Sequence, residues 1–408
     1  MPLGSPHGYT IEEAQARFVA GIAPVGTEDL PLAASLGRIL AFPLLAERLV
    51  PDSPRAAVDG WAVRSDDLAG ASREVPVRLR VAGASLAGHP TAGVLERGET
   101  VRITTGGVVP EGADAAEYQE VCRTEGDYVL FARPVAPMAN VRRAGEDMRP
   151  GQELLAAGER VRPEVIGLLA TLAQERVQVR RRPRVRFVST GDEIHRVGDH
   201  LPTGGTIDSN SLQIGGLLQA LGADVELRGP VPDSAEAIAE ACQGDSFDFL
   251  ITSGGVSVGP ADRIGEAGRM LGAKVMFHWA RMRPGAPTMG LRLGDRPWLG
   301  LSGNPLSAQV GFDVFGRAAI SRLIGAEAGL VRGQARIVAE FRGKAPDAPR
   351  LLRARVELVG AELHASIHPY QSSGGVRAMA QTNGYVIQPE GVAKLEAGSL
   401  VDALVLPV

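Results

Sequence analysis

The sequence has few cysteines, few aromatic residues and no long apolar run. Among its 408 residues only Cys122 and Cys242 are cysteines, and aromatic residues make up 4%. Two cysteines so far apart exclude a disulfide framework and a thiolate zinc site, and we expect both to be inert core residues. No apolar segment approaches the roughly 20 residues that a membrane helix needs. The sequence therefore predicts no interaction with a membrane.

The chain also lacks an excess of positive charge and an export signal. Its formal net charge is −4, which argues against general nucleic-acid binding. The one basic cluster, Arg180 to Arg186, leads directly into a predicted strand, where we expect it to be solvated. The segment MPLGSPHGYT has neither the basic nor the apolar region of a signal peptide. We therefore expect a cytoplasmic protein without a nucleic-acid partner.

Glycine and proline are plentiful, with 51 and 28 residues, which is typical of many short strands and turns. A chain of this length is expected to form two to four domains. We predict a fold of the α/β plus β class. Its predicted parts are a helical and linker domain at 1–50 and 136–177, an inserted β-rich domain at 51–135, an α/β domain at 178–326 and a small C-terminal β domain resembling a barrel at 327–408.

Two helices are expected at the start of the chain. Thr10 is a candidate cap for a helix over 11–22, with acidic residues in the favourable first turn. The segment LPLAASLGRILA, residues 30–41, has the pattern of a second helix. A third helix is predicted to begin near Pro163, because proline is favoured in a first helical turn.

Residues 178–326 show the alternation of a doubly wound domain. The strand patterns VRFVST, ADVELRG and FDFLITS are separated by predicted helices over 210–221 and 234–242. This βαβαβ order predicts a parallel sheet covered by helices on both faces, and further strands are expected at KVMFHWA and PWLGLS. Ligands of such sheets bind at the carboxyl ends of the strands.

The segment FDFLITSGGVSVGPAD, residues 247–262, reads as a buried strand, a glycine-rich turn and a helix start. Gly254, Gly255 and Gly259 can adopt positive φ, and the following helix is expected to aim unpaired N–H groups at the same point, which predicts an anion site. The alternative is a tight turn that binds nothing. The loops STGDE, RPGAP and LSGNP are predicted at the same edge of the sheet. The candidate ligand-binding residues of these loops and of the IDSN segment are Thr190, Gly191, Asp208, Asn210, Ser253, Gly254, Gly255, Ser257, Arg283, Pro284, Ser302, Gly303 and Asn304.

Carboxylates accompany the glycine turns: Asp192, Glu193, Asp208, Asp233 and Asp262. Acidic residues beside a phosphate site are electrostatically unfavourable unless a divalent cation lies between them, so Mg²⁺ is implied. Asp262 and Glu193 are the candidate metal ligands. Helix capping is the alternative, and it is strongest for Asp233 and reasonable for Asp192.

The cations near this edge are Arg281 and Arg283, which directly precede Pro284 and Gly285. We expect one of the two arginines to point toward a bound oxyanion and the other to be solvated. His278 is expected to be a packed strand residue rather than a base, because no matching Ser or Cys nucleophile accompanies it.

Eight ordered motifs together resemble the molybdopterin molybdenumtransferase family, whose eukaryotic relative is the E domain of gephyrin. The resemblance spans nearly the whole chain. The motifs are AVDGWAV at 57–63, RITTGGVVPEGADA at 102–115, NVRRAGEDM at 140–148, STGDE, IDSN, TSGGVSVGPAD, MRPGAP and LSGNPLSA.

The resemblance implies elongated homodimers with four domains. It implies that adenylylated molybdopterin is bound, that molybdate is inserted at the dithiolene and that AMP is released with a divalent cation. Its expected partners are a molybdopterin-adenylylating protein and molybdoenzymes or their chaperones. Arg353 and Ser373 are placed near the molybdate, and Asp59 is expected to act across the dimer interface. The functional polar residues that it implies are Asp59, Thr105, Asp147, Glu193, Asp233 and Asp262.

The chain departs from the family pattern around the molybdate pocket. Trp279, Arg283 and Ala286 stand where many relatives carry lysines, and Ser302 replaces a usual proline, which adds a polar group or loosens the turn. Two alternatives stay open: molybdopterin adenylylation, and a non-catalytic scaffold or cofactor carrier. The additional domains and Asp59 weigh against the first, and the carboxylates Asp59 and Asp262 weigh against the second.

Overall fold

The computed structural model describes residues 8–256, 262–372 and 374–406. The chain forms two compact units. The larger unit contains the chain up to Phe42, Ala157–Ile166 and the chain from Glu175 onward. The smaller unit contains Pro43–Ala156 and Gly167–Gln174.

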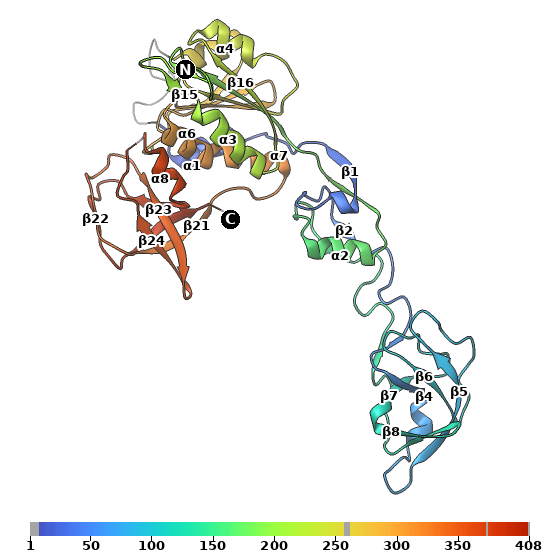
Figure 1. The fold of residues 1–408 in the computed structure, drawn as a ribbon. Helices are drawn as coiled ribbons and strands as arrows, with labels where there is room; N and C mark the ends of the chain where they lie inside the picture. Colours follow the sequence, from blue (N-terminus) through green and yellow to red (C-terminus); the bar gives the residue numbers. More distant parts are fainter. Residues whose placement is uncertain (1–7, 257–261, 373, 407–408) are drawn as a thin grey trace. The chain divides into compact units, whose positions relative to one another are not determined.

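The smaller unit is built on a six-stranded sheet with the order β7-β4-β6-β5-β9-β8 (Figure 1). Only β5 and β6 are parallel neighbours in this sheet. Its core contains Trp61, Leu79 and Phe131. The predicted β-rich domain is therefore confirmed as a fold. The strands are β4 Gly60–Val63, β5 Val77–Ser85, β6 Glu99–Ile103, β7 Ala115–Tyr118, β8 Cys122–Glu125 and β9 Tyr128–Phe131.

The smaller unit also contains two short strand pairs. They join β2 to β11 and β3 to β10 in antiparallel fashion. The predicted helix at Pro163 is confirmed as α2, Pro163–Thr171. The paired strands are β2 Leu44–Leu45, β3 Arg55–Ala56, β10 Val141–Arg142 and β11 Glu153–Leu155.

The larger unit contains the predicted α/β sheet, with the order β16-β13-β17-β20-β19-β18. Strands β16, β13, β17 and β20 run parallel, whereas β19 is antiparallel to both of its neighbours. The sequence pattern missed β19, because its five residues begin with a Met-Gly pair directly after the proline-rich loop. The strands are β13 Arg184–Thr190, β16 Asp224–Val231, β17 Phe249–Ser253, β18 Lys274–His278, β19 Met289–Leu293 and β20 Arg296–Leu301.

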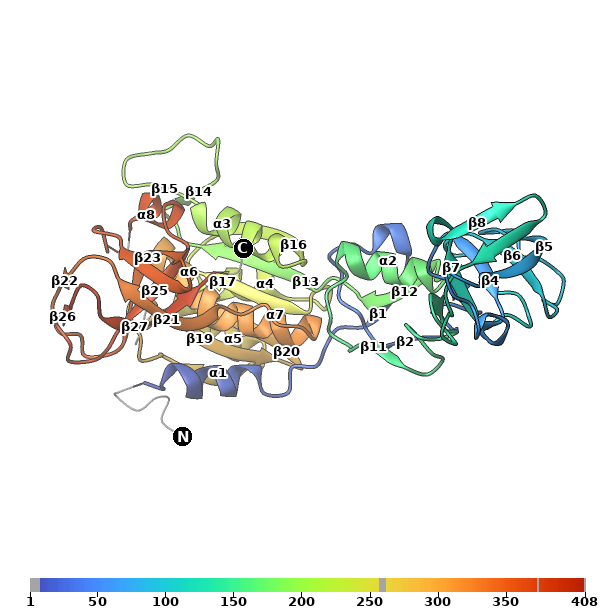
Figure 2. The same ribbon diagram turned by 90° about the horizontal axis from the view of Figure 1, so that it is seen from below.

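Helices cover both faces of this sheet (Figures 1 and 2). One core contains Phe187 and Ile251 of the sheet with α1, α3, α6 and α7, and the other contains Val188 and Leu250 with α4 and α5. Adjacent residues of one strand thus point to opposite faces and are both buried, which explains the continuous apolar runs. The helices are α1 Ile11–Val19, α3 Ser209–Ala220, α4 Ala235–Cys242, α5 Arg263–Met270, α6 Pro305–Gly311 and α7 Arg317–Ile324.

The first predicted helix is confirmed and the second is wrong. Thr10 accepts a hydrogen bond from the Glu13 amide while the Glu13 side chain accepts one from the Thr10 amide, a complete capping box. Residues 30–41 instead begin in β1, Thr27–Pro31, which pairs with β12, Arg176–Arg180, and continue through one 3-10 turn. Gly37 has a φ of 77°, which a helix interior does not allow.

The C-terminal segment forms the expected small β domain, a closed barrel with the order β21-β24-β23-β25-β27. Its core contains Leu352, Val386 and Ala403. The barrel is joined to the helical segment between α6 and α7 by a buried hydrogen bond, in which the Tyr385 hydroxyl donates to Asp313 at 2.7 Å. The elements are β21 Val331–Ile337, β22 Phe341–Arg342, β23 Arg350–Val359, β24 Glu362–Ile367, α8 Val376–Ala380, β25 Gly384–Gln388, β26 Lys394–Leu395 and β27 Leu400–Val405.

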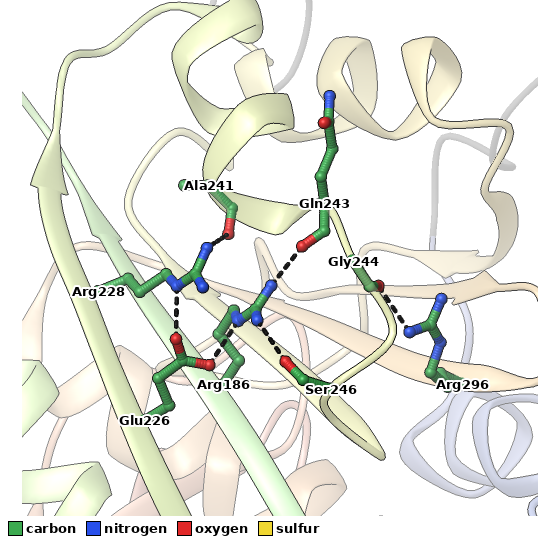
Figure 3. A network of polar contacts seen from close by, with 8 residues as sticks. All are labelled: Arg186, Glu226, Arg228, Ala241, Gln243, Gly244, Ser246 and Arg296. Carbon is green, nitrogen blue, oxygen red and sulfur yellow. Dashed lines mark hydrogen bonds and ion pairs between the residues drawn. The ribbon is translucent and has the colours of Figure 1, made fainter.

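The basic cluster at the start of β13 is not uniformly solvated. Arg186 is only 2% exposed, and its guanidinium donates to Glu226, to the Gln243 carbonyl and to the Ser246 hydroxyl (Figure 3). It also lies over the Phe247 ring, 4.6 Å from the centroid. The expectation of a solvated cluster is therefore wrong for Arg186, because the loop before β17 encloses its side chain.

Cys242 is buried in the core as expected, whereas Cys122 is half-buried in β8. Both Cys122 and Cys242 are free, and burial raises the pKa of each thiol to about 12. Within the described part of the chain, no helix is long and apolar enough to span a membrane.

Candidate functional site

A pocket of about 170 Å³ opens at the carboxyl ends of the parallel strands. Its wall comes from the ends of β13 and β17, the starts of β14 (Ile194–His195), α3 and α4, and the loop after β20. Ten of its twelve lining residues are candidates from the sequence. The pocket is lined by Ser189, Thr190, Gly191, Glu193, Ile194, Asp208, Asn210, Asp233, Ser253, Gly254, Gly255 and Gly303.

Glycine is required where the loops after β13 and β17 meet. Gly254 has a φ of 101°, and a Cβ there would lie 2.3 Å from the Thr190 carbonyl oxygen. Gly255 has a φ of 63°, and a Cβ there would lie 3.5 Å from Asp233 Oδ1. Side chains at these positions would clash with one loop and fill the space beside a carboxylate. The glycine pair therefore lets the backbone form the pocket wall.

The carboxylates of the pocket have different local roles. Asp208 caps α3, because its Oδ1 accepts a hydrogen bond from the Ser211 amide at 3.0 Å. The helix-capping alternative for Asp233 is wrong: Ser234 caps α4, with its hydroxyl accepting from the Ala237 amide. The adjacent serine has the extended backbone that a cap needs, which leaves Asp233 in the pocket wall.

Asp192 holds the Asp233 loop in place. Its Oδ1 accepts a hydrogen bond from the Asp233 amide at 3.2 Å. No helix follows Asp192, since the chain enters β14 at Ile194. The helix-capping alternative for Asp192 is therefore wrong, and its carboxylate positions a neighbouring pocket residue instead.

Asp262 is the N-terminal cap of α5. Its Oδ1 accepts a hydrogen bond from the Gly265 amide at 2.9 Å, and it does not line the pocket. The amides of Arg263 and Ile264 donate to the Gly255 carbonyl at 3.1 and 3.3 Å. The expected unpaired N–H groups are thus already partnered at these three residues, because the glycine loop folds back onto the helix start. Ser257 and Gly259 lie outside the described residues.

The LSGNP loop is closed by its serine. Ser302 Oγ accepts a hydrogen bond from the Asn304 amide at 3.3 Å, and the Ser302 carbonyl accepts one from Ser253 Oγ at 3.2 Å. Asn304 is the N-cap residue of α6, and Pro305 follows at the first helical position. Ser302 therefore stabilises the turn. The sequence alone had left open whether this serine adds a polar group or loosens the turn.

Both rim arginines pair with carboxylates of the C-terminal segment. Arg281 donates to Glu390 at 2.7 Å, and Arg283 forms an ion pair of 2.7 Å with Asp347. Neither arginine nor Pro284 lines the pocket. Arg283 also pairs its backbone with the barrel, donating to the Pro349 carbonyl at 2.9 Å. The loop that carries the candidate oxyanion ligands is thereby fixed to the barrel.

His278 is a packed strand residue at the end of β18. Burial lowers the pKa of its imidazole, although the negative charge of Asp262 raises it in part. The structure gives its buried Nε2 no hydrogen-bond partner among the described residues.

Arg353 lies inside the barrel domain and is 1% exposed. Its guanidinium donates to the carbonyls of Tyr370, Ser372 and Gly375 at 2.7–3.1 Å. Burial lowers the pKa of this arginine. The side chain thus orders the loop before α8. Ser373, the other residue expected near the molybdate, lies outside the described residues.

The structure brings together two candidate residues of the smaller unit. Asp59 Oδ1 accepts a hydrogen bond from the Thr105 amide at 2.7 Å, so the AVDGW segment and the TTGG turn are adjacent. Both residues are exposed. Asp147, also exposed, donates its amide to the Val50 carbonyl at 3.1 Å.

Two pocket residues were missed by the sequence analysis, Ser189 and Ile194. Each directly adjoins the STGDE candidates, and Ser189 is the last β13 residue on the α3 face of the sheet before the loop. Strand alternation could have identified Ser189, because Val185 and Phe187 face the same helix. Ile194 carried no such signal.

The described residues contain no group of three or more His, Cys, Asp or Glu side chains that could hold a metal ion alone. A cation at the pocket would therefore need oxygen atoms from another source. Mg²⁺ commonly binds in this way, through one or two carboxylates together with substrate phosphates and water.

Three family descriptions match the chain in order. Residues 9–173 match the MoeA N-terminal region (domain I and II), and residues 337–406 match the MoeA C-terminal region (domain IV). Between them, residues 186–322 match a probable molybdopterin binding domain.

Curated relatives match this chain over most of their own length. The chain is 35% identical over 389 residues to the molybdopterin molybdenumtransferase of Bacillus subtilis, covering 93% of this chain and 90% of that protein. It is 33% identical over 395 residues to the protein of the same name from Nostoc sp., with coverages of 94% and 89%. The crystal structure of a molybdopterin biosynthesis MoeA protein from Pyrococcus horikoshii superimposes with a TM-score of 0.87 at 28% identity, covering 98% of this chain and 100% of that one.

Proposed function

Because the chain belongs to the molybdopterin molybdenumtransferase family, we propose that it inserts molybdate into adenylylated molybdopterin and releases AMP. The observation that supports this most is the composition of the pocket. Glu193, Asp208 and Asp233 surround a glycine turn at the carboxyl ends of the parallel strands. A nucleotide phosphate at the turn and a cation at the carboxylates are electrostatically complementary.

The proposed Mg²⁺ ligands are carboxylates, the donor type that this ion prefers. Glu193 in the wall and Asp262 at the adjoining helix start are the proposed ligands, and a carboxylate that caps a helix through one oxygen keeps lone pairs for a cation. When bound, Mg²⁺ would neutralise charge on the phosphate oxygens during cleavage of the anhydride.

The protein's own residues position the substrate. Asp192 holds the Asp233 amide, and Asn210 donates to Ser253 and to the Gly303 carbonyl, so that three loops are linked at the pocket. Because these contacts already hold the loops in place, the loops lose little conformational entropy when the anhydride of the substrate is positioned for reaction.

Molybdate is proposed to bind near Arg353, Ser373 and the MRPGAP loop. Arg283 is paired with Asp347 in this structure, so an oxyanion at Arg283 would replace that carboxylate as its partner. Both side chains are well exposed, and an exchange of this kind costs little because surface ion pairs are weak.

Asp59, Thr105 and Asp147 belong to the smaller unit. We propose that they act in the site of a dimer mate, so the active form is a homodimer. Light scattering at working concentration tests this, and a monomeric mass would contradict it. The molybdopterin-adenylylating protein is the proposed donor of the substrate, and molybdoenzymes or their chaperones are the proposed acceptors.

The direct test is to supply adenylylated molybdopterin, Mg²⁺ and molybdate and to follow AMP. The expected result is AMP release that depends on molybdate. The matched control omits molybdate, since a simple hydrolase would release AMP in both reactions. Equal release with and without molybdate, or no release at all, would contradict the proposed function.

A further inference from the structure

Two buried polar atoms at the pocket have no hydrogen-bond partner within the described part of the chain. They are Ser189 Oγ, on a residue 3% exposed, and Asn210 Oδ1, on a residue 7% exposed. Both residues line the pocket. We call these two atoms the open pair. Buried polar atoms are nearly always hydrogen-bonded in native proteins, to protein groups, to ordered water or to a bound ligand.

The orientation of the Asn210 amide is fixed by its neighbours. Asn210 Nδ2 donates to Ser253 Oγ at 2.8 Å and to the Gly303 carbonyl at 2.9 Å. A flipped amide would place Oδ1 against the Gly303 carbonyl oxygen, and two acceptors cannot bond. Asn210 Oδ1 therefore remains an acceptor.

Ser189 lies on the strand next to Ser253, the residue that bonds this amide group, and the two serines pair in parallel register. On the other side, Gly229 approaches so closely that a Cβ there would lie 2.8 Å from Ser189 Oγ. The hydroxyl is thus enclosed between β16 and β17 at the end of the α3 face.

We propose that the open pair binds the hydrogen-bonding edge of a fused nitrogen heterocycle in the substrate. This inference rests on the proposed function. Asn210 Oδ1 accepts only, so its ligand must donate an N–H or O–H group, and ionised phosphate or molybdate oxygens cannot do so. Ser189 Oγ can donate to a ring nitrogen or carbonyl beside that donor.

A pocket of about 170 Å³ holds one part of such a substrate, since pockets for whole drug-sized ligands measure about 300–1,000 Å³. Pterin and adenine each present an amino donor beside a ring acceptor. Both occur in adenylylated molybdopterin, and the experiment must distinguish them.

Ser189→Ala removes one atom of the open pair, and Thr252→Val is its matched control. Thr252 is fully buried on the next strand, and its hydroxyl accepts a hydrogen bond from Trp298 Nε1 at 3.0 Å. Binding of 6-hydroxymethylpterin and of adenosine, both without phosphate, is measured by fluorescence or calorimetry in buffer without molybdate. Inorganic pyrophosphate is the third probe.

For Ser189→Ala we expect an unchanged or higher Tm and about tenfold weaker binding of one heterocycle, with pyrophosphate binding unchanged. Thr252→Val should lower Tm and leave all three affinities unchanged. With adenylylated molybdopterin, Ser189→Ala should raise KM about tenfold and keep kcat. Whichever heterocycle loses affinity is assigned to the open pair.

Wild-type affinity of Ser189→Ala for both heterocycles, together with an unchanged KM, would overturn the inference. Weakened pyrophosphate binding with intact heterocycle binding would overturn it as well, because the hydroxyl would then serve the phosphates. If the wild-type protein released no AMP, the proposed function would be contradicted. The ratio of the Ser189→Ala affinity to the wild-type affinity for each heterocycle would still test this inference.

Discussion

At the amino end of β13 each donor nitrogen of the buried Arg186 guanidinium has a hydrogen-bond partner (Figure 3), whereas at the carboxyl end of the same strand the Ser189 hydroxyl has none among the described residues. Only three positions separate the two residues. Both are at least 97% buried. The contrast therefore arises from the loops at the two ends and not from depth in the protein.

This difference indicates that buried polar groups at the two ends of this sheet have different roles. At the amino end, the segment between α4 and β17 supplies partners for Arg186, and Arg228 shares Glu226 with it. Satisfied buried groups of this kind stabilise one arrangement of loops. At the carboxyl end the open pair keeps hydrogen-bonding capacity for a ligand, at a cost to stability.

The largest expected effect is on stability at the amino end. Arg186→Ala should lower the free energy of unfolding by about 2–4 kcal/mol, because the Gln243 carbonyl and the Ser246 hydroxyl lose their donor. Urea denaturation measures this. The matched control, Arg184→Ala, removes an arginine that is 54% exposed on the same strand and should cost less than about 0.5 kcal/mol.

The activity of folded Arg186→Ala enzyme should equal that of the wild type. If its KM or kcat changed while the unfolding free energy did not, the two ends of the strand would not have the separate roles described.

The next effect is on activity at the carboxyl end. Asp262→Asn should reduce molybdate-dependent AMP release about 10–100-fold with little change in Tm. Asparagine caps a helix as well as aspartate does, so α5 keeps its cap while the carboxylate charge is lost. Ser234→Asn is the control, since it alters the cap of α4 without removing a charge. Unchanged turnover in Asp262→Asn would show that the residue is only a cap.

The sequence predicted most of the sheet because its strands are continuous apolar runs. The helix expected over 30–41 failed because its first residues pair with β12 as part of β1, and Leu40 bridges to Val179 of the same strand, so the contacts join segments 139–153 positions apart. Local pattern does not report such pairing. The burial of Arg186 was missed for the same reason, since its partners lie 40–60 positions away.

The pocket was predicted well where its residues lie in short motifs. Ser189 was missed because its neighbours in the STGDE motif carry the charge and the glycine. The cap formed by Asp262 and the pairing of Arg283 with Asp347 also depend on backbone geometry and on a distant loop. Their roles toward a ligand stay predictions.

A smaller effect concerns the aromatic ring at the amino end. Phe247 is 2% exposed and lies 4.6 Å from the guanidinium groups of both Arg186 and Arg296. Phe247→Leu should cost about 1–2 kcal/mol of unfolding free energy. A double-mutant cycle with Arg296→Ala should give a coupling of about 0.5–1 kcal/mol. Strict additivity of the two substitutions would contradict a cation–π contribution.

The smallest expected effect is a difference between the two ends of β13 in how stability depends on pH. Burial raises the pKa of Glu226, but hydrogen bonds from Arg186 and Arg228 outweigh it and hold this pKa below its ordinary value of 4.5. A depressed folded-state pKa gives stability that is fully present above about pH 5 and is lost as the pH falls through the folded pKa. The stability difference between wild type and Glu226→Gln should therefore shrink below pH 4.5. Because Glu226 is 44% exposed, that difference should stay under about 1 kcal/mol.

The difference in unfolding free energy between wild type and Ser189→Ala should not vary with pH, since neither atom of the open pair titrates in this range. Urea denaturation from pH 3.5 to 7 measures both, and a Glu226→Gln difference that grows toward low pH would contradict the assignment.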